Sequence, residues 1–146
     1  MSELTREVWA AFVPHTGAMA LIDAVASWDA TRIHAIGERH TLASHPLRRT
    51  QGLHAAHLAE YAAQASAVHG VLHAGMNGET ARREGMLVSV RDMRLMVEYV
   101  ELSHGRLDVH AEKMLADERG AQYAFNVEQG GQLLASGRVA AMYVNA

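Results

Sequence analysis

The sequence contains no cysteine among its 146 residues, and it has only two prolines and two tryptophans. The lack of cysteine excludes disulfides, thiol catalysis and metal sites with cysteine ligands. Apolar runs are too short for a membrane-spanning helix, which needs about eighteen residues or more. The first ten residues also lack the apolar segment of an export signal, so we expect a cytoplasmic protein.

Positively charged residues are fewer than negatively charged ones. Thirteen Lys and Arg residues face sixteen Asp and Glu residues, which gives a net charge of −3. Without a basic run, nucleic acid is a poor candidate for a partner. What the chain does have is apolar residues, at 49%, and no internal repeat or linker. A chain of this length buries roughly 68% of its unfolded surface, so we expect a single domain over residues 1–146.

One segment has the periodicity of a long helix, Leu53–Ala74. Its apolar residues recur at spacings of three and four, and alanine, the best helix former, is abundant. Around this helix, alternating apolar residues and turn signals predict strands. The predicted strands are Ala24–Trp28, Thr31–Arg39, Met86–Val100, Arg106–Leu115, Gln122–Glu128 and Gln132–Val144, with loops over Thr41–Gly52 and residues 75–85.

This order of elements predicts an α+β fold in which one helix packs on one antiparallel sheet. A single helix covers only part of a sheet of five or six strands. We therefore expect the chain to form a dimer, either by pairing edge strands or by burying helices together.

The segment from Ser44 to Gln64 carries the groups best suited to chemistry. His45 lies in the predicted loop, and an imidazole with a pKa near 6.5 is a serviceable base. Glu60 has Leu58, Ala59, Ala62 and Ala63 as neighbours. If these bury its carboxylate, its pKa rises and it becomes a proton donor. The helix entrance adds free amide N–H groups that suit a developing oxyanion.

Two sequence motifs here resemble those of a known family. His45-Pro46, followed by a helix with Glu60-Tyr61-Ala62-Ala63-Gln64-Ala65, resembles the hotdog-fold β-hydroxyacyl thioester dehydratases of fatty acid synthesis. Val13-Pro14-His15 and Leu21-Ile22-Asp23-Ala24-Val25 are similar to the opening motif of that family. The motifs His-Pro-Leu-Arg and Glu-Tyr-x-Ala-Gln-Ala resemble even more closely those of the predicted 3-hydroxyacyl-carrier-protein dehydratases of aryl-polyene gene clusters.

The resemblance implies a hotdog fold, in which a sheet wraps a long helix and two subunits pair into a larger sheet. It implies that His45 takes the α-proton of a 3-hydroxyacyl thioester and that Glu60 of the other subunit protonates the departing hydroxyl. The amide of Ala55 would polarise the thioester carbonyl, and Gln64 would support Glu60. The product would be a trans-2-enoyl thioester. The acyl group would be carried on phosphopantetheine or coenzyme A, and no metal or redox cofactor would be needed.

Three features depart from the family pattern. Ser44-His45-Pro46-Leu47 stands where the family has Gly-His-Phe-Pro. The His-to-Glu spacing is one residue longer than in the standard dehydratases, although the polyene branch shares it. His54 and Ala55 replace the proline and glycine at the helix entrance. Two alternatives to a dehydratase stay open. One is an acyl thioesterase, because hotdog proteins also hydrolyse acyl-CoA with a helix carboxylate and water. The other is a non-catalytic hotdog subunit that partners an active dehydratase, which the departures at His54 and Ala55 allow.

Two other groups of residues have rival interpretations. His54, His57 and Glu60, and also His69 and His73, have spacings that place ligands on one helix face. No second motif completes a metal site, so we expect none. Two arginine pairs are either solvated or dock an acidic acyl carrier protein: Arg48 with Arg49, and Arg82 with Arg83.

Overall fold

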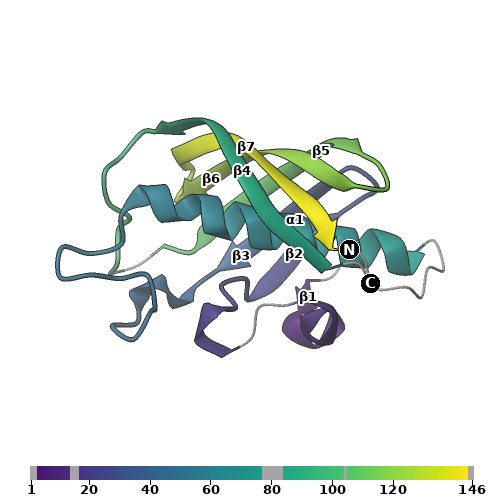
Figure 1. The fold of residues 1–146 in the computed structure, drawn as a ribbon. Helices are drawn as coiled ribbons and strands as arrows, with labels where there is room; N and C mark the ends of the chain where they lie inside the picture. The colour runs from purple at the N-terminus through teal and green to yellow at the C-terminus, as the bar shows by residue number, and fades with distance from the viewer. Residues whose placement is uncertain (1–2, 14–16, 77–83, 104, 145–146) are drawn as a thin grey trace.

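The computed structural model describes residues 3–13, 17–76, 84–103 and 105–144 (Figure 1). Its one α-helix in these ranges is α1, Leu58–Met76, and a curved antiparallel sheet wraps around it. The strands are β1 (Leu4–Thr5), β2 (Ala24–Trp28), β3 (Arg32–Gly37), β4 (Glu84–Leu95), β5 (Leu107–Ala116), β6 (Gly120–Gln129) and β7 (Gln132–Val144). The predicted α+β class is confirmed.

The described strands form one sheet in the order β1-β2-β3-β5-β6-β7-β4. Each neighbouring pair is antiparallel, and the long pairs β5–β6 and β6–β7 are joined by short turns. The strand that follows the helix in sequence, β4, pairs only with β7 and so forms one edge of the sheet. The sheet has seven strands in the described ranges, where five or six were expected, because the short strand β1, which was not predicted, joins it.

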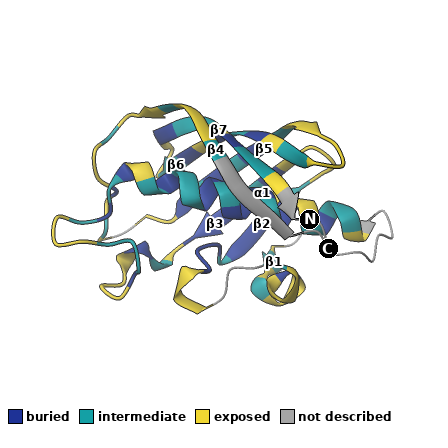
Figure 2. Ribbon diagram, viewed as in Figure 1, coloured by how far each residue is buried: buried dark blue, intermediate teal, exposed yellow. Residues whose placement is uncertain are grey.

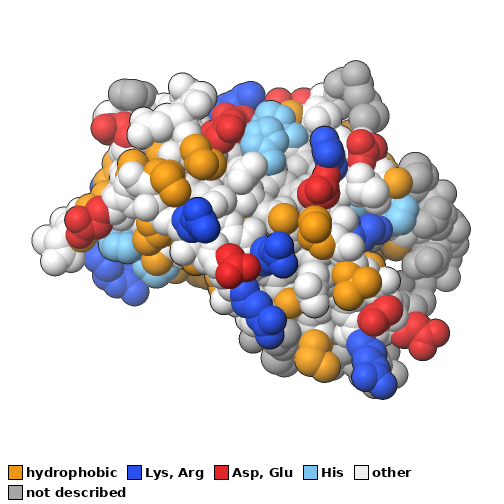
Figure 3. All heavy atoms as spheres, turned by 90° about the horizontal axis from the view of Figure 1, so that it is seen from above, with side chains coloured by type: hydrophobic (Ala, Val, Ile, Leu, Met, Phe, Trp, Pro, Cys, Tyr) orange, Lys and Arg blue, Asp and Glu red, His pale blue; other side chains and the backbone are white. Residues whose placement is uncertain are grey.

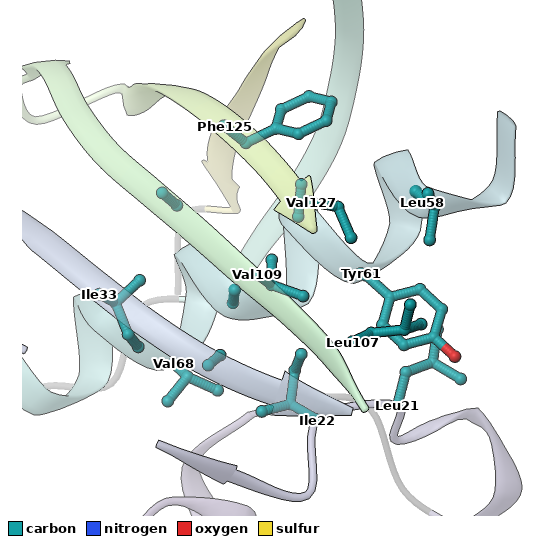
Figure 4. Close-up of a cluster of buried hydrophobic side chains, with 14 of the residues drawn as sticks. Leu21, Ile22, Ile33, Leu58, Tyr61, Val68, Leu107, Val109, Phe125 and Val127 are labelled. Atoms are coloured by element: carbon teal, nitrogen blue, oxygen red, sulfur yellow. The ribbon is translucent and has the colours of Figure 1, made fainter. Parts of the chain in front are cut away.

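The helix is buried by the apolar stripe that predicted it. Its inward side chains are at most 8% exposed: Leu58, Tyr61, Ala62, Ala65, Val68 and Leu72. Figure 2 shows the buried residues concentrated on α1 and on the inner face of the sheet. Figure 4 shows how helix residues such as Tyr61 meet Leu107 and Val127 from the strands. The small alanine side chains let the sheet approach the helix closely.

The helix begins later than predicted. Leu53 and His54 are not helical: the Leu53 carbonyl accepts from the Val100 amide at 2.9 Å, and His54 forms a β-bridge with Tyr99. A 3₁₀ turn over Ala55–His57 follows, and the α-helix starts at Leu58. His54 caps this turn, because its Nδ1 accepts the Ala56 amide at 3.0 Å.

The predicted strand Met86–Val100 is too long at its end. β4 stops at Leu95, and residues 96–100 leave the sheet to run beside the helix entrance. Two contacts hold them there, the bond of Val100 to Leu53 and a bond from the Ala55 amide to the Glu98 carbonyl. The local alternation continues past Leu95, so the sequence gives no sign of where the ladder ends. The strands Ala24–Trp28 and Gln132–Val144 are confirmed to the residue, and the predicted strands Thr31–Arg39, Arg106–Leu115 and Gln122–Glu128 differ from the observed ones by one or two residues at each end.

The outer face of the sheet is mixed, with hydrophobic side chains scattered among polar and charged ones. Figure 3 shows side chains of both charges, and histidines, spread over the face seen from above. Across β3 and β5, the rings of His34 and His110 stack with centroids 4.3 Å apart, and His34 Nε2 lies 2.7 Å from Asp108 Oδ1. Within the described ranges, no helix has the length and apolar character that crossing a membrane requires.

Candidate active site

His45 lies in the loop that leads to the helix, and two backbone bonds fix its position. Its amide donates to the Leu42 carbonyl at 3.0 Å, and its carbonyl accepts from the Arg48 amide at 3.1 Å. The side chain is 6% exposed. His45 is therefore a buried residue in a loop that otherwise lies near the surface.

Both ring nitrogens of His45 have partners. The Leu47 amide donates to Nδ1 at 3.2 Å, and Nε2 lies 2.9 Å from the hydroxyl of Tyr61. A backbone N–H can only donate, so Nδ1 must carry a lone pair. The neutral ring then has its hydrogen on Nε2 and donates it to the Tyr61 oxygen.

Burial lowers the pKa of His45, because it penalises the charged imidazolium. Nearby positive charges lower the pKa further; these are His40, Arg39, Arg48 and His57. His45 is therefore neutral at pH 7 and able to accept a proton.

Tyr61 comes from the second turn of α1 and is 1% exposed. Its ring is parallel to that of His45, with an interplanar angle of 6°. Burial, and next the charge of Asp23, raise the pKa of the Tyr61 phenol well above its usual value, so it stays protonated. Gly37 on β3 makes room for the ring, since a Cβ atom there would lie 2.8 Å from Tyr61 Cε2.

Glu60 is half-buried, and Gln64 one turn later donates to its Oε1 at 3.1 Å. Gln64 itself is 3% exposed and is fixed at both ends of its amide. Its Oε1 accepts from the Leu21 amide at 2.8 Å, and its Nε2 also donates to the Met19 carbonyl at 2.8 Å. These two bonds leave Gln64 in one orientation, in which it can only donate to Glu60.

The helix entrance was predicted to offer a free amide at Ala55. In the structure the Ala55 amide donates to the Glu98 carbonyl at 2.8 Å, and the residue is fully buried. The Ala56 amide donates to His54 Nδ1. Each of these two amides thus has a partner within the chain, and the predicted role of Ala55 stays a prediction.

The arginines near His45 brace their own loop. Arg48 donates to the Thr41 carbonyl at 3.2 Å, and Arg49 donates to the Pro46 and Arg48 carbonyls, each at 3.2 Å. Arg48 is half-buried and Arg49 is exposed. The other predicted pair, Arg82 and Arg83, lies outside the described residues.

A second buried histidine–tyrosine pair lies further along α1. His69 is fully buried, with Nδ1 2.6 Å from the Tyr123 hydroxyl on β6 and Nε2 2.8 Å from the Asp29 carbonyl after β2. Burial lowers its pKa as well. His73 stacks on it at 5.9 Å and meets the Lys113 ammonium at 3.2 Å. In the described ranges, no three His, Asp or Glu side chains are arranged to hold a metal ion.

Sequence reasoning selected candidate site residues but missed the tyrosine that the structure places against the first of them. It singled out His45, Glu60 and Gln64 but assigned nothing to Tyr61, which it placed in the core. The Glu-Tyr dipeptide was the available signal, because residues adjacent on a helix point in directions about 100° apart. One can then face the core while the other faces a surface.

Comparison with known proteins agrees with this architecture. The sequence model of a family named ApeP-like, described as ApeP dehydratase, matches residues 8–145. No curated protein sequence matches at a significant level.

Several solved structures share the fold. One is the dehydratase heterocomplex ApeI:P from Xenorhabdus doucetiae, with a TM-score of 0.81 and 24% identity over 92% of this chain and 89% of that one. A thioesterase from Pseudomonas aeruginosa (a mutant) matches with a TM-score of 0.68 and 14% identity, covering 95% and 92% of the two chains. A thioesterase from Haemophilus influenzae gives a TM-score of 0.68 and 12% identity, with coverages of 97% and 92%. At these identities the likeness shows the fold alone, and it confirms the predicted hotdog architecture.

Proposed function

The chain belongs to the ApeP-like dehydratase family, and from that premise we propose that it acts in the dehydration of a 3-hydroxyacyl thioester to a trans-2-enoyl thioester. The observation that carries the proposal is the environment of His45. A buried, neutral imidazole with a lowered pKa and a fixed ring is suited to take a proton at neutral pH. The fixed Gln64 on Glu60 supplies the second oriented group.

In the proposed reaction His45 takes the α-proton, and the electron pair of that C–H bond becomes the new carbon–carbon double bond. The bond from the β-carbon to its hydroxyl breaks, and the oxygen leaves as water with a proton from Glu60. The Glu60 that serves a given His45 comes from the adjoining subunit. His45 then loses its extra proton to solvent and Glu60 gains one, which restores both groups. No metal or redox cofactor takes part in these steps.

The thioester carbonyl is the remaining reacting group, and the Ala55 amide is its proposed donor. The Glu98 carbonyl occupies that amide, so the substrate oxygen has to replace it. The proposal therefore requires the segment that carries Glu98 to shift when substrate binds. The substitution Ala55→Pro removes this N–H together with its bond to Glu98, so the variant is assayed after circular dichroism has verified its fold. Wild-type kcat in a folded Ala55→Pro protein would reject the role.

The partner in the proposal is a second hotdog subunit, either another copy or a different chain. The similar solved structure from Xenorhabdus doucetiae is named as a dehydratase heterocomplex, ApeI:P. The edge strand β4 pairs only with β7 within this chain, so its other side is the natural place to extend the sheet. Exposed apolar side chains there, at Val90 and Leu95, favour such a contact.

The substrate is proposed to arrive on the phosphopantetheine of an acyl carrier protein or on coenzyme A. Arg48 and Arg49 lie in the loop of His45, where their side chains also bind loop carbonyls, and we propose that they meet an acidic carrier. Replacing both by alanine should slow turnover of carrier-bound substrate more than that of a short free thioester. Equal slowing of both substrates would reject carrier docking and leave only the loop-bracing role.

One assay separates the candidate functions. The purified protein is incubated alone with a 3-hydroxyacyl thioester, and product is followed by mass spectrometry together with free thiol. Enoyl product supports dehydration. Release of thiol without enoyl product supports the thioesterase alternative. Turnover that begins only when a second hotdog subunit is added supports a partner-dependent role.

A further inference from the structure

We propose that Asp23 is a positioning residue for the dehydration: its carboxylate fixes the turn from which the loop of His45 begins and offsets the positive charge of Arg39 in that turn. The same short segment, residues 19–23, also holds the side chain that binds Glu60. This inference rests on the proposed function. It goes beyond that function because it makes both groups depend on a segment that is far from them in sequence.

The first part of the segment acts on the acid of the proposed reaction. The Met19 carbonyl and the Leu21 amide fix the two ends of the Gln64 amide, each at 2.8 Å. Gln64 in turn donates to Glu60 at 3.1 Å. Leu21 is 3% exposed and lies in the core cluster with Tyr61 (Figure 4). The segment therefore holds Gln64 from a rigid part of the molecule.

The last residue of the segment, Asp23, binds the turn that precedes the loop. This turn is a 3₁₀ helix, Arg39–Thr41. Oδ2 of Asp23 accepts the Glu38 amide at 2.8 Å. Oδ1 lies 2.8 Å from Nε of Arg39 and 4.0 Å from Nη1 of Arg6. Each carboxylate oxygen thus binds a residue at the start of the turn.

The ion pair with Asp23 compensates for the burial of Arg39. The Nε and Nη2 atoms of its guanidinium are buried, and they form no hydrogen bond with the described residues. A buried charge is costly unless an opposite charge lies beside it. The carboxylate of Asp23 supplies that charge, so it keeps the side chain of Arg39, and with it the turn, in place.

The turn is continuous with the loop of His45. The Leu42 amide donates to the Arg39 carbonyl at 3.0 Å, and the His45 amide donates to the Leu42 carbonyl at 3.0 Å. Arg48, after the histidine, returns to the turn through a bond to the Thr41 carbonyl at 3.2 Å. Because each step is one short bond, a displacement of Arg39 moves the backbone that carries the imidazole.

The charge balance near His45 gives Asp23 a second effect. Burial lowers the pKa of His45, and so do the positive groups around it, which are His40, Arg39, Arg48 and His57. The Tyr61 phenol also faces the ring, and after burial the charges of Asp23 and Arg39 shift its pKa in opposite directions. The two charges therefore offset each other here. Without Asp23, the charge of Arg39 is unopposed and disfavours the imidazolium.

The experiment compares wild type with Asp23→Asn, Arg39→Gln and the double variant. NMR titration gives the pKa of His45. Steady-state kinetics give kcat and KM for a short 3-hydroxyacyl thioester, with a partner subunit added if wild type needs one. Asp108→Asn is the matched control, because Asp108 also pairs with an arginine, Arg106 at 3.1 Å, and its side chain is 17% exposed, as is that of Asp23.

We expect the pKa of His45 to fall in Asp23→Asn, to rise in Arg39→Gln and to return close to the wild-type value in the double variant. Each single shift should be about 0.3–1 pH unit, since the ion pair is partly exposed to solvent. In all three variants kcat should fall about threefold to tenfold with KM within about twofold, because the turn has lost its anchor. Asp108→Asn should change neither quantity.

Two results would overturn the inference. One is a pKa of His45 that does not move in opposite directions in the two single variants. The other is a kcat in Asp23→Asn no lower than that in Asp108→Asn.

A further variant keeps the test open if Asp23→Asn does not fold. Arg39→Lys retains the charge and should keep the pKa of His45; a shift as large as that of Arg39→Gln would contradict the charge effect. If wild type dehydrates no 3-hydroxyacyl thioester with or without a partner, the proposed function fails. The NMR titrations still decide the effect of Asp23 on His45 in that case.

Discussion

The two buried histidine–tyrosine pairs of α1 have the same composition and opposite polarity. In the pair His69–Tyr123, the Asp29 carbonyl takes the Nε2 hydrogen, so Nδ1 accepts from the tyrosine hydroxyl. In the pair His45–Tyr61, the Leu47 amide donates to Nδ1, so the hydrogen of the neutral ring is on Nε2 and is donated to the tyrosine oxygen. One tyrosine donates, and the other accepts.

The pairs also differ in what they connect. His69 joins the helix, the turn after β2 and strand β6, and each partner is part of the rigid framework. His45 is on a loop, and its Nδ1 partner lies in that same loop. The first pair holds three elements together. The second can exchange a partner without opening the sheet, which is the property that a reactive group needs.

The largest contrast is expected in turnover. His45→Asn should lower kcat by about 10²- to 10⁴-fold, the range for loss of a general base, while the unfolding free energy changes little. His34→Asn, on β3 beside Asp108 and not among the groups that act on His45, serves as control and should keep wild-type turnover. A His45→Asn enzyme with more than about a tenth of wild-type activity would contradict the assignment of the base.

The reverse contrast is expected in stability. His69→Leu fills a similar volume but leaves the Tyr123 hydroxyl and the Asp29 carbonyl without this partner, so it should cost about 2–4 kcal/mol of unfolding free energy. Urea denaturation measures this cost. The folded fraction should keep its kcat; a stable His69→Leu protein with poor turnover would show that the two pairs are not separable.

Acid should destabilise the fold through both histidines. The pKa values of His45 and His69 are lowered in the folded state, while the unfolded chain titrates near 6.5. The unfolded state therefore binds more protons below that pH, and stability is complete above about 6.5 and falls as pH drops below it. Urea midpoints at pH 7.5 and 5.5 give the size of the loss.

Single substitutions distribute this acid effect between the pairs. His69→Gln should make the stability less dependent on pH than wild type, and by more than His45→Gln does, because His69 is fully buried. An undiminished pH dependence in both variants would assign the effect to other groups, such as His110, whose pKa burial also lowers.

The smallest difference is expected for the two hydroxyls. Tyr123→Phe should cost about 1–1.5 kcal/mol and Tyr61→Phe about 0.5–1 kcal/mol, because only the former bond joins two framework elements. Thermal unfolding of both variants measures the order. A larger cost for Tyr61→Phe would mean that the loop is as rigid as the sheet, which removes the contrast on which the comparison rests.

The elements of the fold could be predicted because each has its own local period. The alanine-rich stripe of α1 and the alternation in β5, β6 and β7 can each be recognised within one continuous segment of the sequence. The candidate residues could be selected for a similar reason, since His45 and Glu60 are part of short motifs.

The partners of these residues could not be predicted in the same way. Gln64 meets the backbone of Met19 and Leu21, more than forty positions away, and His69 meets Tyr123 at a separation of 54. Such contacts depend on how the sheet closes over the helix. The end of β4 is a similar case, because tertiary bonds at Leu53 and Ala55 draw residues 96–100 out of a run that still alternates.

The glycine at position 37 of β3 affects residues beyond its own strand. Gly37 is the point at which the sheet and the Tyr61 ring nearly touch, and beyond that ring lies the imidazole of His45. Sheet, ring and imidazole therefore form a stack with no slack, so that positions 37, 61 and 45 are not free to vary one at a time. A substitution of Gly37 should therefore displace Tyr61 and change the proton affinity of His45 in the loop. Relatives that carry a larger side chain at position 37 should carry a residue smaller than tyrosine at position 61.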